Sequence, residues 1–268
     1  MKTFSVTEDT TLKNFTDAVY PQGSFCLSAL LKGRDVKING VRVNKNTALK
    51  KGDTVVYYTD KKQEEMPSHT VVFEDGNVLV ADKFSGVSSE ALFCELKEKR
   101  EVYAVHRLDR NTQGLIIYAK TKSAEKELLS AFRNRKINKT YIALCKNNFK
   151  EKRSTLTAYL KKDEKSGTVK IFGKPCANAV KIITEYSVTE EDGDIATVKI
   201  NLHTGRTHQI RAHMSFIGCP VLGDNKYGDG AFNAKYNAKR QRLTAKFLEF
   251  NLDGELSYLN GKIFESNL

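Results

Sequence analysis

The hydrophobic pattern of the first 60 residues predicts a small module of helices followed by strands. Apolar residues first recur at helical spacing. An alternating segment then surrounds Asn39 and Gly40, a pair typical of a hairpin with a type I′ turn, because both central positions of that turn need positive φ. The predicted elements are helices at Leu12–Tyr20 and Ser24–Lys32, a hairpin at Val36–Val43 and a strand at Thr54–Tyr58.

A polar segment, residues 61–69, follows this module and is predicted to be a linker because it is charged and contains Pro67. Beyond it, short apolar runs alternate with polar loops. Strands outnumber helices, so we expect an α+β fold in which residues 70–268 are built on a mixed, largely antiparallel sheet. The predicted strands are Val78–Ala81, Val102–Val105, Leu115–Ala119, Tyr141–Cys145, Val198–Leu202 and Phe247–Leu252, and the predicted helix is Ser123–Arg135 with Ser123 as its N-cap.

The charge of the chain favours a polyanionic partner. It carries 44 Lys and Arg against 32 Asp and Glu, a net charge of +12 over 268 residues. Cations that neutralise phosphates release counterions, which is a strong driving force for nucleic-acid binding. A well-charged surface without such a partner is the alternative.

No stretch of 18 apolar residues is present, so we expect no membrane association, and the first residues lack the apolar core of a signal peptide. The five cysteines are far apart and form no Cys-x-x-Cys pair. Reduced thiols in the cytoplasm are therefore expected, rather than disulfides or a cysteine zinc site.

A polar loop, His106–Gly114, lies between two predicted strands and contains Asp109 between Arg107 and Arg110. An aspartate flanked by cations stays ionised, which suits a nucleophile or a charge stabiliser better than a general acid. The same pattern is also typical of a surface loop with an ordinary ion pair.

A second polar segment carries three histidines, His203, His208 and His213, at intervals of five residues. That spacing does not align side chains on one helical face, and no suitable thiol or carboxylate is near in sequence, so no metal site is predicted. Arg206 and Arg211 in this strand-to-helix turn suit a phosphate or a partner carboxylate.

Four ordered motifs identify a family resemblance across residues 78–268. Residues 106–115 match His-Arg-Leu-Asp-x-x-Thr-Ser-Gly-Leu except at Gln113, and residues 204–213 match Thr-Gly-Arg-x-His-Gln-Ile-Arg-x-His completely. Residues 218–228 match Gly-x-Pro-x-x-Gly-Asp-x-x-Tyr-Gly, and residues 139–143 match Lys-x-Tyr-x-Ala. This region resembles the RluA-like pseudouridine synthases, which modify ribosomal or transfer RNA.

Two further positions depart from the family pattern. Phe84 replaces the proline of Asn-Lys-Pro-x-Gly, and Thr244 replaces the histidine of a late Leu-His-Ala. Neither position is catalytic in the family, so these departures bear on the choice of substrate more than on activity.

Residues 10–58 resemble the small basic RNA-binding domain named after ribosomal small-subunit protein four. The match rests on residues 28–34, 36–40 and 51–53, while the family's Arg-Leu-Asp opening reads Thr-Leu-Lys at residues 11–13. Such a domain commonly precedes these synthases. The cations expected to contact phosphates are Lys32, Arg34, Lys37 and Arg42.

The resemblance implies that the chain isomerises uridine to pseudouridine, a reaction without net redox change that needs no cofactor. It implies that Asp109 is the catalytic carboxylate, acting as a nucleophile or as a base, and that Arg211 is its cationic partner, with Arg206 as the alternative. Tyr141 is expected to stack on the uracil beside Ile210. Arg107 is expected to fill the space that the flipped uridine leaves in the RNA.

Two other functions are alternatives to a pseudouridine synthase. One is a non-catalytic RNA-binding factor on the same scaffold, although such a factor has no chemical need for Asp109, Tyr141 and Arg211 together. The other is a metal-dependent hydrolase using the histidines. We expect RNA as the only obligatory partner and a monomeric protein, and the sequence leaves open the target uridine and the class of RNA.

Overall fold

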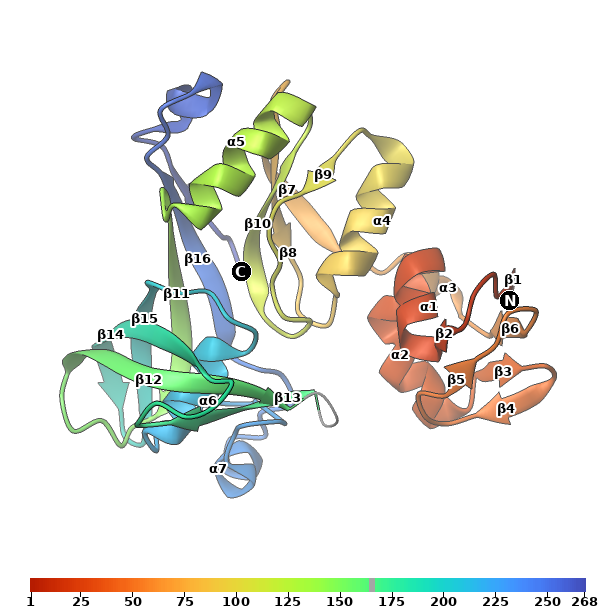
Figure 1. Ribbon diagram of the computed structural model, residues 1–268. Coiled ribbons are helices and arrows are strands. Elements are labelled where there is room, and N and C mark those ends of the chain that lie inside the picture. Colours follow the sequence, from red (N-terminus) through yellow and green to blue (C-terminus); the bar gives the residue numbers. More distant parts are fainter. Residues whose placement is uncertain (164–166) are drawn as a thin grey trace.

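The structure is a computed structural model that describes residues 1–163 and 167–268. A sheet of eleven strands dominates it, in the order β13-β12-β14-β15-β11-β16-β10-β8-β7, with β17 paired to β16 and β9 paired to β10 (Figure 1). The pair β10–β16 is parallel and the other strand pairs of this sheet are antiparallel. The expected α+β fold with a mixed, largely antiparallel sheet is therefore confirmed.

The strands of the large sheet are β7 (His69–Glu74), β8 (Val78–Lys83), β9 (Tyr103–Ala104), β10 (Gln113–Ala119), β11 (Ile137–Lys146), β12 (Arg153–Asp163), β13 (Thr168–Phe172), β14 (Val180–Asp192), β15 (Ile195–Leu202), β16 (Leu243–Phe250) and β17 (Ile263–Glu265). The helices beyond residue 60 are α3 (Lys61–Glu64), α4 (Ser89–Lys99), α5 (Lys122–Arg133), α6 (Gln209–Phe216), α7 (Gly230–Lys235) and a 3-10 helix at Glu255–Leu259.

Residues 1–60, the N-terminal module, have a sheet of their own. Helices α1 (Leu12–Val19) and α2 (Pro21–Gly33) pack beside β1 (Lys2–Ser5), β3 (Val36–Ile38), β4 (Val41–Val43) and β6 (Thr54–Tyr57), while β2 (Thr10–Thr11) pairs with β5 (Ala48–Leu49). The predicted hairpin is confirmed, because Asn39 and Gly40 have φ of 49° and 82° between β3 and β4. A separate apolar cluster that includes Leu12, Leu30 and Tyr57 forms the core of the module.

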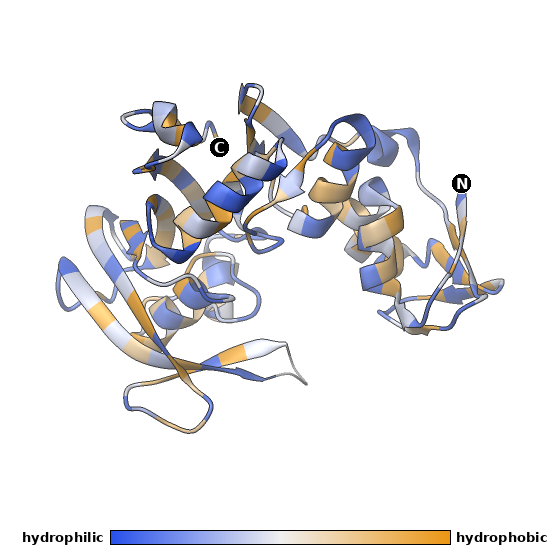
Figure 2. Cartoon of the chain, turned by 45° about the horizontal axis from the view of Figure 1, so that its top comes forward, coloured by the Kyte–Doolittle hydropathy of each residue, from blue (hydrophilic) through white to orange (hydrophobic). Residues whose placement is uncertain are grey.

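The central strands of the large sheet are buried on both faces. Along β8, Leu79 and Ala81 belong to one apolar cluster, whereas Val78 and Val80 belong to a second on the opposite face. This alternation follows from the two-residue period of a strand and explains why β8 is apolar almost throughout. Figure 2 shows hydrophobic positions on the strands and hydrophilic ones in most loops.

Gly114 allows the parallel pairing of β10 with β16. Its φ is +108°, and a Cβ at this position would lie 2.3 Å from the carbonyl oxygen of Ala245 on β16. Only glycine permits this approach of two backbones, which brings the loop before β10 against the start of β16.

Several local predictions were wrong in detail. Thr121, not Ser123, caps α5, since its hydroxyl accepts from the Ala124 amide at 3.1 Å, and Ser123 instead donates to Glu255. The long strands β12 and β14 and the helix α4 were not predicted. Both strands mix Thr, Lys and acidic residues with apolar ones and are half-exposed, so they lack the continuous apolar runs by which the buried strands were found.

The segment 61–69 is partly structured. It begins with the single-turn helix α3, which is capped by Asp60, and its Glu64 accepts a hydrogen bond from Tyr20. Its last residue, His69, is the first residue of β7. Elsewhere, no helix among the described residues is long and apolar enough to cross a membrane.

Candidate active site

The loop that carries Asp109 is fixed on both sides. Before it, Ser89 at the start of α4 bonds both the amide and the carbonyl of Leu108, at 3.0 and 2.9 Å. After it, the Thr112 amide donates to the Asp109 carbonyl at 3.1 Å and closes a turn. The Thr112 hydroxyl accepts from Gln241 at 2.9 Å. The backbone at Asp109 is therefore held by contacts from three parts of the chain.

Lys83 supports the same loop from beneath. Its ammonium is fully buried and donates to the carbonyls of Phe84, Val87 and Arg110 at 3.3, 2.8 and 3.2 Å. Burial lowers the pKa of Lys83 to about 7, and the charge of Asp109 opposes this shift. Lys83 was not among the predicted site residues, although it lies in the segment compared with Asn-Lys-Pro-x-Gly.

The structure brings Asp109 and Arg211 together across 102 residues. Nη1 of Arg211, on α6, lies 3.0 Å from Oδ2 of Asp109. This distance is within the range of a charge-assisted hydrogen bond. Arg206, the alternative partner, is exposed, and no contact between it and Asp109 is found.

A second carboxylate, Asp224, holds the other side of the same guanidinium. Nε and Nη2 of Arg211 donate to its two oxygens at 2.7 and 2.9 Å, and the amides of Lys226 and Tyr227 donate to it as well. Burial penalises the charge of each partner, but the ion pair outweighs this and raises the pKa of Arg211 while lowering that of Asp224. Asp224 was not among the predicted site residues, although it is the Asp of the matched Gly-Asp pair at residues 223–224.

Asp109 lies at a cavity of about 170 Å³. Tyr141 from β11 and Ile210 from α6 line it, and both are buried, so aromatic and aliphatic surfaces lie beside the carboxylate. Burial, with the nearby Asp109 charge, raises the pKa of Tyr141, so the phenol stays neutral. A cavity of this size is smaller than the pockets of drug-sized ligands and suits one planar base.

His208 faces Oδ2 of Asp109, the same oxygen that Arg211 contacts. Its Nε2 is 4.0 Å from Oδ2 of Asp109, and its Nδ1 is 2.8 Å from the hydroxyl of Tyr227. The amide of Val169 donates to that hydroxyl at 2.8 Å, so Tyr227 links His208 to the start of β13.

The three histidines do not converge. His203 contacts Glu185 at 3.0 Å and His213 contacts Thr184 at 3.0 Å, while His208 faces Asp109. Across residues 1–163 and 167–268, no cluster of three or more His, Cys, Asp or Glu side chains is arranged to hold a metal ion.

Arg107 and Arg206 are at the exposed rim of the cavity. Arg107 extends outward and pairs with Glu90 at 3.0 Å, both side chains being about half exposed or more. The predicted cations of the N-terminal module are outside this cavity. Lys37 and Arg42 each lie 5.4 Å from the centroid of the Tyr58 ring, while Lys32 and Arg34 are exposed near the end of α2.

The departures from the family motifs have local structural partners. Gln113 on β10 donates to the Thr244 hydroxyl on β16 at 3.2 Å, so two of the altered positions contact each other. The Phe84 amide donates to the Ser68 carbonyl at 2.9 Å, a bond that a proline could not make.

This fold, with a carboxylate and an arginine paired at a base-sized cavity, defines an enzyme site suited to nucleotide chemistry. A family model described as RNA pseudouridylate synthase matches residues 57–216. The chain therefore belongs to the RNA pseudouridine synthase family, which makes it an isomerase.

Named relatives agree with this assignment. The chain is 30% identical over 252 residues to the ribosomal large subunit pseudouridine synthase C of Vibrio cholerae, covering 82% of this chain and 78% of that one. It is 31% identical over 252 residues to an uncharacterized RNA pseudouridine synthase of Aquifex aeolicus, with the same coverage. The solved structure of human RNA Pseudouridylate Synthase Domain Containing 1 is similar, with a TM-score of 0.60 and 28% identity over 69% of this chain and 79% of that one.

Proposed function

We propose that this enzyme converts uridine to pseudouridine in large-subunit ribosomal RNA, with Asp109 as its catalytic carboxylate. The observation that carries the proposal is the Asp109–Arg211 pair beside Tyr141 at a cavity of base size. The relatives named as large-subunit ribosomal RNA synthases support this class of RNA over transfer RNA.

Asp109 is suited to act on the sugar of the target nucleotide. Breaking the glycosidic bond loads positive charge on the ribose, and an ionised carboxylate stabilises that charge. Arg211 orients the carboxylate through its hydrogen bond to Oδ2. Tyr141 and Ile210 hold the detached uracil while it turns so that its carbon five can bond to the sugar. Whether Asp109 attacks the anomeric carbon or removes a sugar proton is compatible with the same geometry.

The target uridine has to leave its stack to enter the cavity. Arg107 is proposed to occupy the vacated space, because it extends from the cavity rim on the loop that carries Asp109. To do so it exchanges Glu90, its exposed partner, for RNA. Arg206 is proposed to bind a phosphate at the same rim.

Residues 1–60 are proposed to be an RNA-binding domain of the type named after ribosomal small-subunit protein four. Its helices, its hairpin and the cations around Tyr58 support this. The proposed linker is residues 61–69 and the proposed catalytic domain is residues 70–268. We propose a cytoplasmic monomer, because the RNA is the large partner and the five cysteines are free thiols.

The proposed site is tested with Asp109→Asn, which keeps the shape of the side chain and removes its charge. We expect pseudouridine formation in bulk ribosomal RNA to be abolished while RNA binding and the unfolding midpoint change little. Mass-spectrometric detection of pseudouridine gives the readout. Turnover within about tenfold of wild type, a loss of only ~1.4 kcal/mol in transition-state stabilisation, would exclude Asp109 as the catalytic group.

A further inference from the structure

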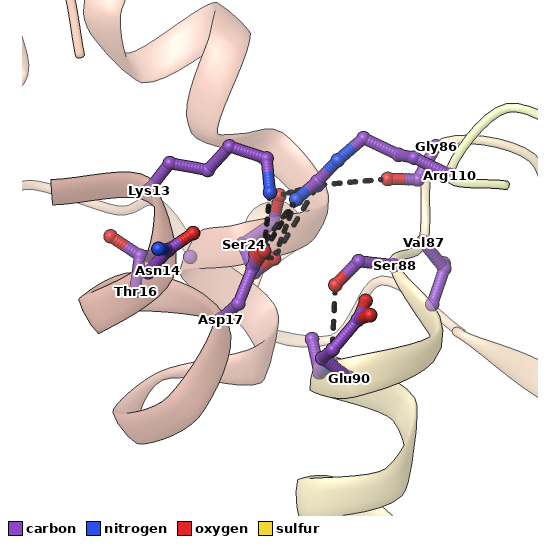
Figure 3. Close-up of polar contacts among 12 residues, drawn as sticks. Lys13, Asn14, Thr16, Asp17, Ser24, Gly86, Val87, Ser88, Glu90 and Arg110 are labelled. Carbon is purple, nitrogen blue, oxygen red and sulfur yellow. Dashed lines mark hydrogen bonds and ion pairs between the residues drawn. The ribbon is translucent and has the colours of Figure 1, made fainter. Parts of the chain in front are cut away.

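The side chain that follows Asp109 reaches out of the catalytic loop and into the N-terminal module. Nη2 of Arg110 donates to the two oxygens of Asp17, on α1, at 2.7 and 3.0 Å. Its Nη1 donates to the carbonyl of Ser24, on α2, at 2.8 Å and to the carbonyl of Gly86 at 3.2 Å. Figure 3 shows this guanidinium between the two helices of the module and the loop before α4.

Asp17 is built to receive a cation. It is 5% exposed, and within its own module it accepts hydrogen bonds from Lys13 at 2.9 Å and from Ser24. Burial alone would raise the pKa of Asp17, but the charge of Arg110 and the bonds from Ser24 and Lys13 outweigh it and lower the pKa. The ion pair is therefore largely buried, with the Arg110 side chain 26% exposed, and Nη2 bonds both carboxylate oxygens, unlike the fully exposed pairs that contribute little.

The backbone of Arg110 is part of the turn that positions Asp109. Its carbonyl accepts from the Gly86 amide at 2.9 Å and from the Lys83 ammonium at 3.2 Å. The turn closes between Asp109 and Thr112, so Arg110 is one of its two central residues. The N-terminal module fixes the side chain of Arg110. It therefore restricts the backbone of the turn that carries Asp109.

Apolar packing at the junction points the same way. Phe25 of α2 packs against the apolar cluster of the large sheet, a cluster that also contains Leu108, Tyr141 and Ile210. The contacts of α1 and α2 with α4 lie at the same junction, where Figure 1 shows the module beside the large sheet. The module thus shares both an ion pair and core packing with the elements that carry the site.

We propose that Asp17 and Ser24 of the N-terminal module are positioning residues for catalysis, which hold Arg110 and thereby the catalytic loop. The module then has a role in the chemical step in addition to RNA binding. The residues that the sequence assigns to catalysis, Asp109, Arg211 and Tyr141, all lie beyond the linker. The proposal rests on Asp109 being the catalytic group, which the Asp109→Asn variant tests separately.

The test uses the full-length protein with Asp17→Asn, Arg110→Gln and the double variant. We expect each single variant to lower the single-turnover rate at saturating RNA by about tenfold, which corresponds to ~1.4 kcal/mol. The double variant should be no slower than the slower single variant, because both single variants remove the same Arg110–Asp17 contact. Hydrogen exchange should show faster exchange at the Gly86 and Thr112 amides, which bond to Arg110 and Asp109.

Asp9→Asn is the matched control, since Asp9 is an exposed carboxylate of the same module that pairs with Lys50 at 2.7 Å. It should change neither the rate nor the exchange. Arg110→Gln keeps the Lys13–Asp17–Ser24 contacts inside the module, so it remains informative if Asp17→Asn unfolds that module. Rates at saturating RNA within twofold of wild type in Arg110→Gln, with only RNA affinity altered, would overturn the proposal.

Discussion

At the scale of single residues, the site depends on one guanidinium shared by two carboxylates. Arg211 gives two of its donors to Asp224, whose side chain is fully buried, and one to Asp109, whose side chain is 19% exposed. Asp224 therefore anchors the arginine, and the arginine presents its remaining edge to Asp109. A lysine cannot reproduce this division, because its ammonium lacks the fixed planar fork.

Arg211→Lys is therefore expected to slow the single-turnover rate by about 10- to 100-fold, or ~1.4–2.7 kcal/mol, with RNA affinity little changed. Arg211→Met should also lower the free energy of unfolding by about 3–5 kcal/mol, because it leaves the buried Asp224 unpaired. Lys136→Met, which removes a pair with the exposed Asp253, is the control. A wild-type rate in Arg211→Lys would show that one cationic contact suffices.

A second residue-scale prediction concerns Lys83, whose buried ammonium has a pKa of about 7 in the folded protein. In the unfolded chain the lysine pKa is about 10.4, so between these two pKa values the unfolded state binds more protons than the folded state. The contribution of Lys83 to stability should therefore rise with pH above about 7, by at most ~1.4 kcal/mol per pH unit.

Lys83→Met cannot titrate, so it isolates this contribution. The unfolding free energy of wild type minus that of Lys83→Met should increase from pH 7 to pH 9 and stay constant below pH 7. Urea unfolding at several pH values measures it. A difference that is constant from pH 6 to pH 9 would mean that the buried ammonium keeps its proton throughout that range.

The residue scale also shows what the sequence could provide. The motifs around Asp109 and Arg211 contain enough fixed positions to name both, and the structure places the two side chains within 3.0 Å. Asp224 and Lys83 lie in matched segments too, but their importance depends on burial and on contacts with distant atoms. Asp17 lies in none of the matched motifs, and its contact with Arg110, 93 residues away, depends on the fold.

At the scale of elements, the parallel pairing of β10 with β16 places the start of one strand beside that of the other. The register pairs Gln113 with Thr244, and their side chains are hydrogen-bonded at 3.2 Å. The family pattern has Ser and His at these positions, a short and a long side chain. This chain has a long side chain and a short one at the same two positions, which is the reverse order.

This interpretation predicts that the two positions are energetically coupled. Gln113→Ser and Thr244→His should each lower the free energy of unfolding, the first by losing a hydrogen bond of about 0.5–1.5 kcal/mol and the second by crowding. The double variant should be more stable than the sum of the single effects by at least about 0.5 kcal/mol. Additive losses in urea unfolding would show that the contact is incidental.

Element prediction succeeded where burial is complete and failed where it is partial. The strands β8 and β10 are buried on both faces, so their continuous apolar runs were evident in the sequence. The half-exposed β12 and β14 depend on each other and on β15 for their pairing. Such pairing is a tertiary effect that a local pattern does not contain.

At the scale of the whole molecule, the net charge of +12 has to be related to particular surfaces. The N-terminal module presents Lys37 and Arg42 near the ring of Tyr58, and Arg42 also lies near Asp35 at 3.6 Å. Two cations at an aromatic ring combine phosphate attraction with a surface on which a base can stack. The helices of the same module contact Arg110, in the loop of Asp109.

The double variant Lys37→Gln/Arg42→Gln tests whether this surface binds phosphates. Each phosphate contact releases counterions, so the slope of log affinity against log salt should become shallower by about 1.4 for single-stranded RNA, from ~0.7 per contact. Lys50→Gln, which removes an exposed lysine of the same module that is paired with Asp9, should leave the slope near that of wild type. Binding isotherms at four salt concentrations measure the slopes. An unchanged slope in the double variant, with a shallower slope in Lys50→Gln, would assign the RNA contact to the surface around Lys50 instead. The two faces have separate roles in this view: the cations around Tyr58 set affinity and its salt dependence, while Asp17 and Ser24 set the rate once RNA is bound.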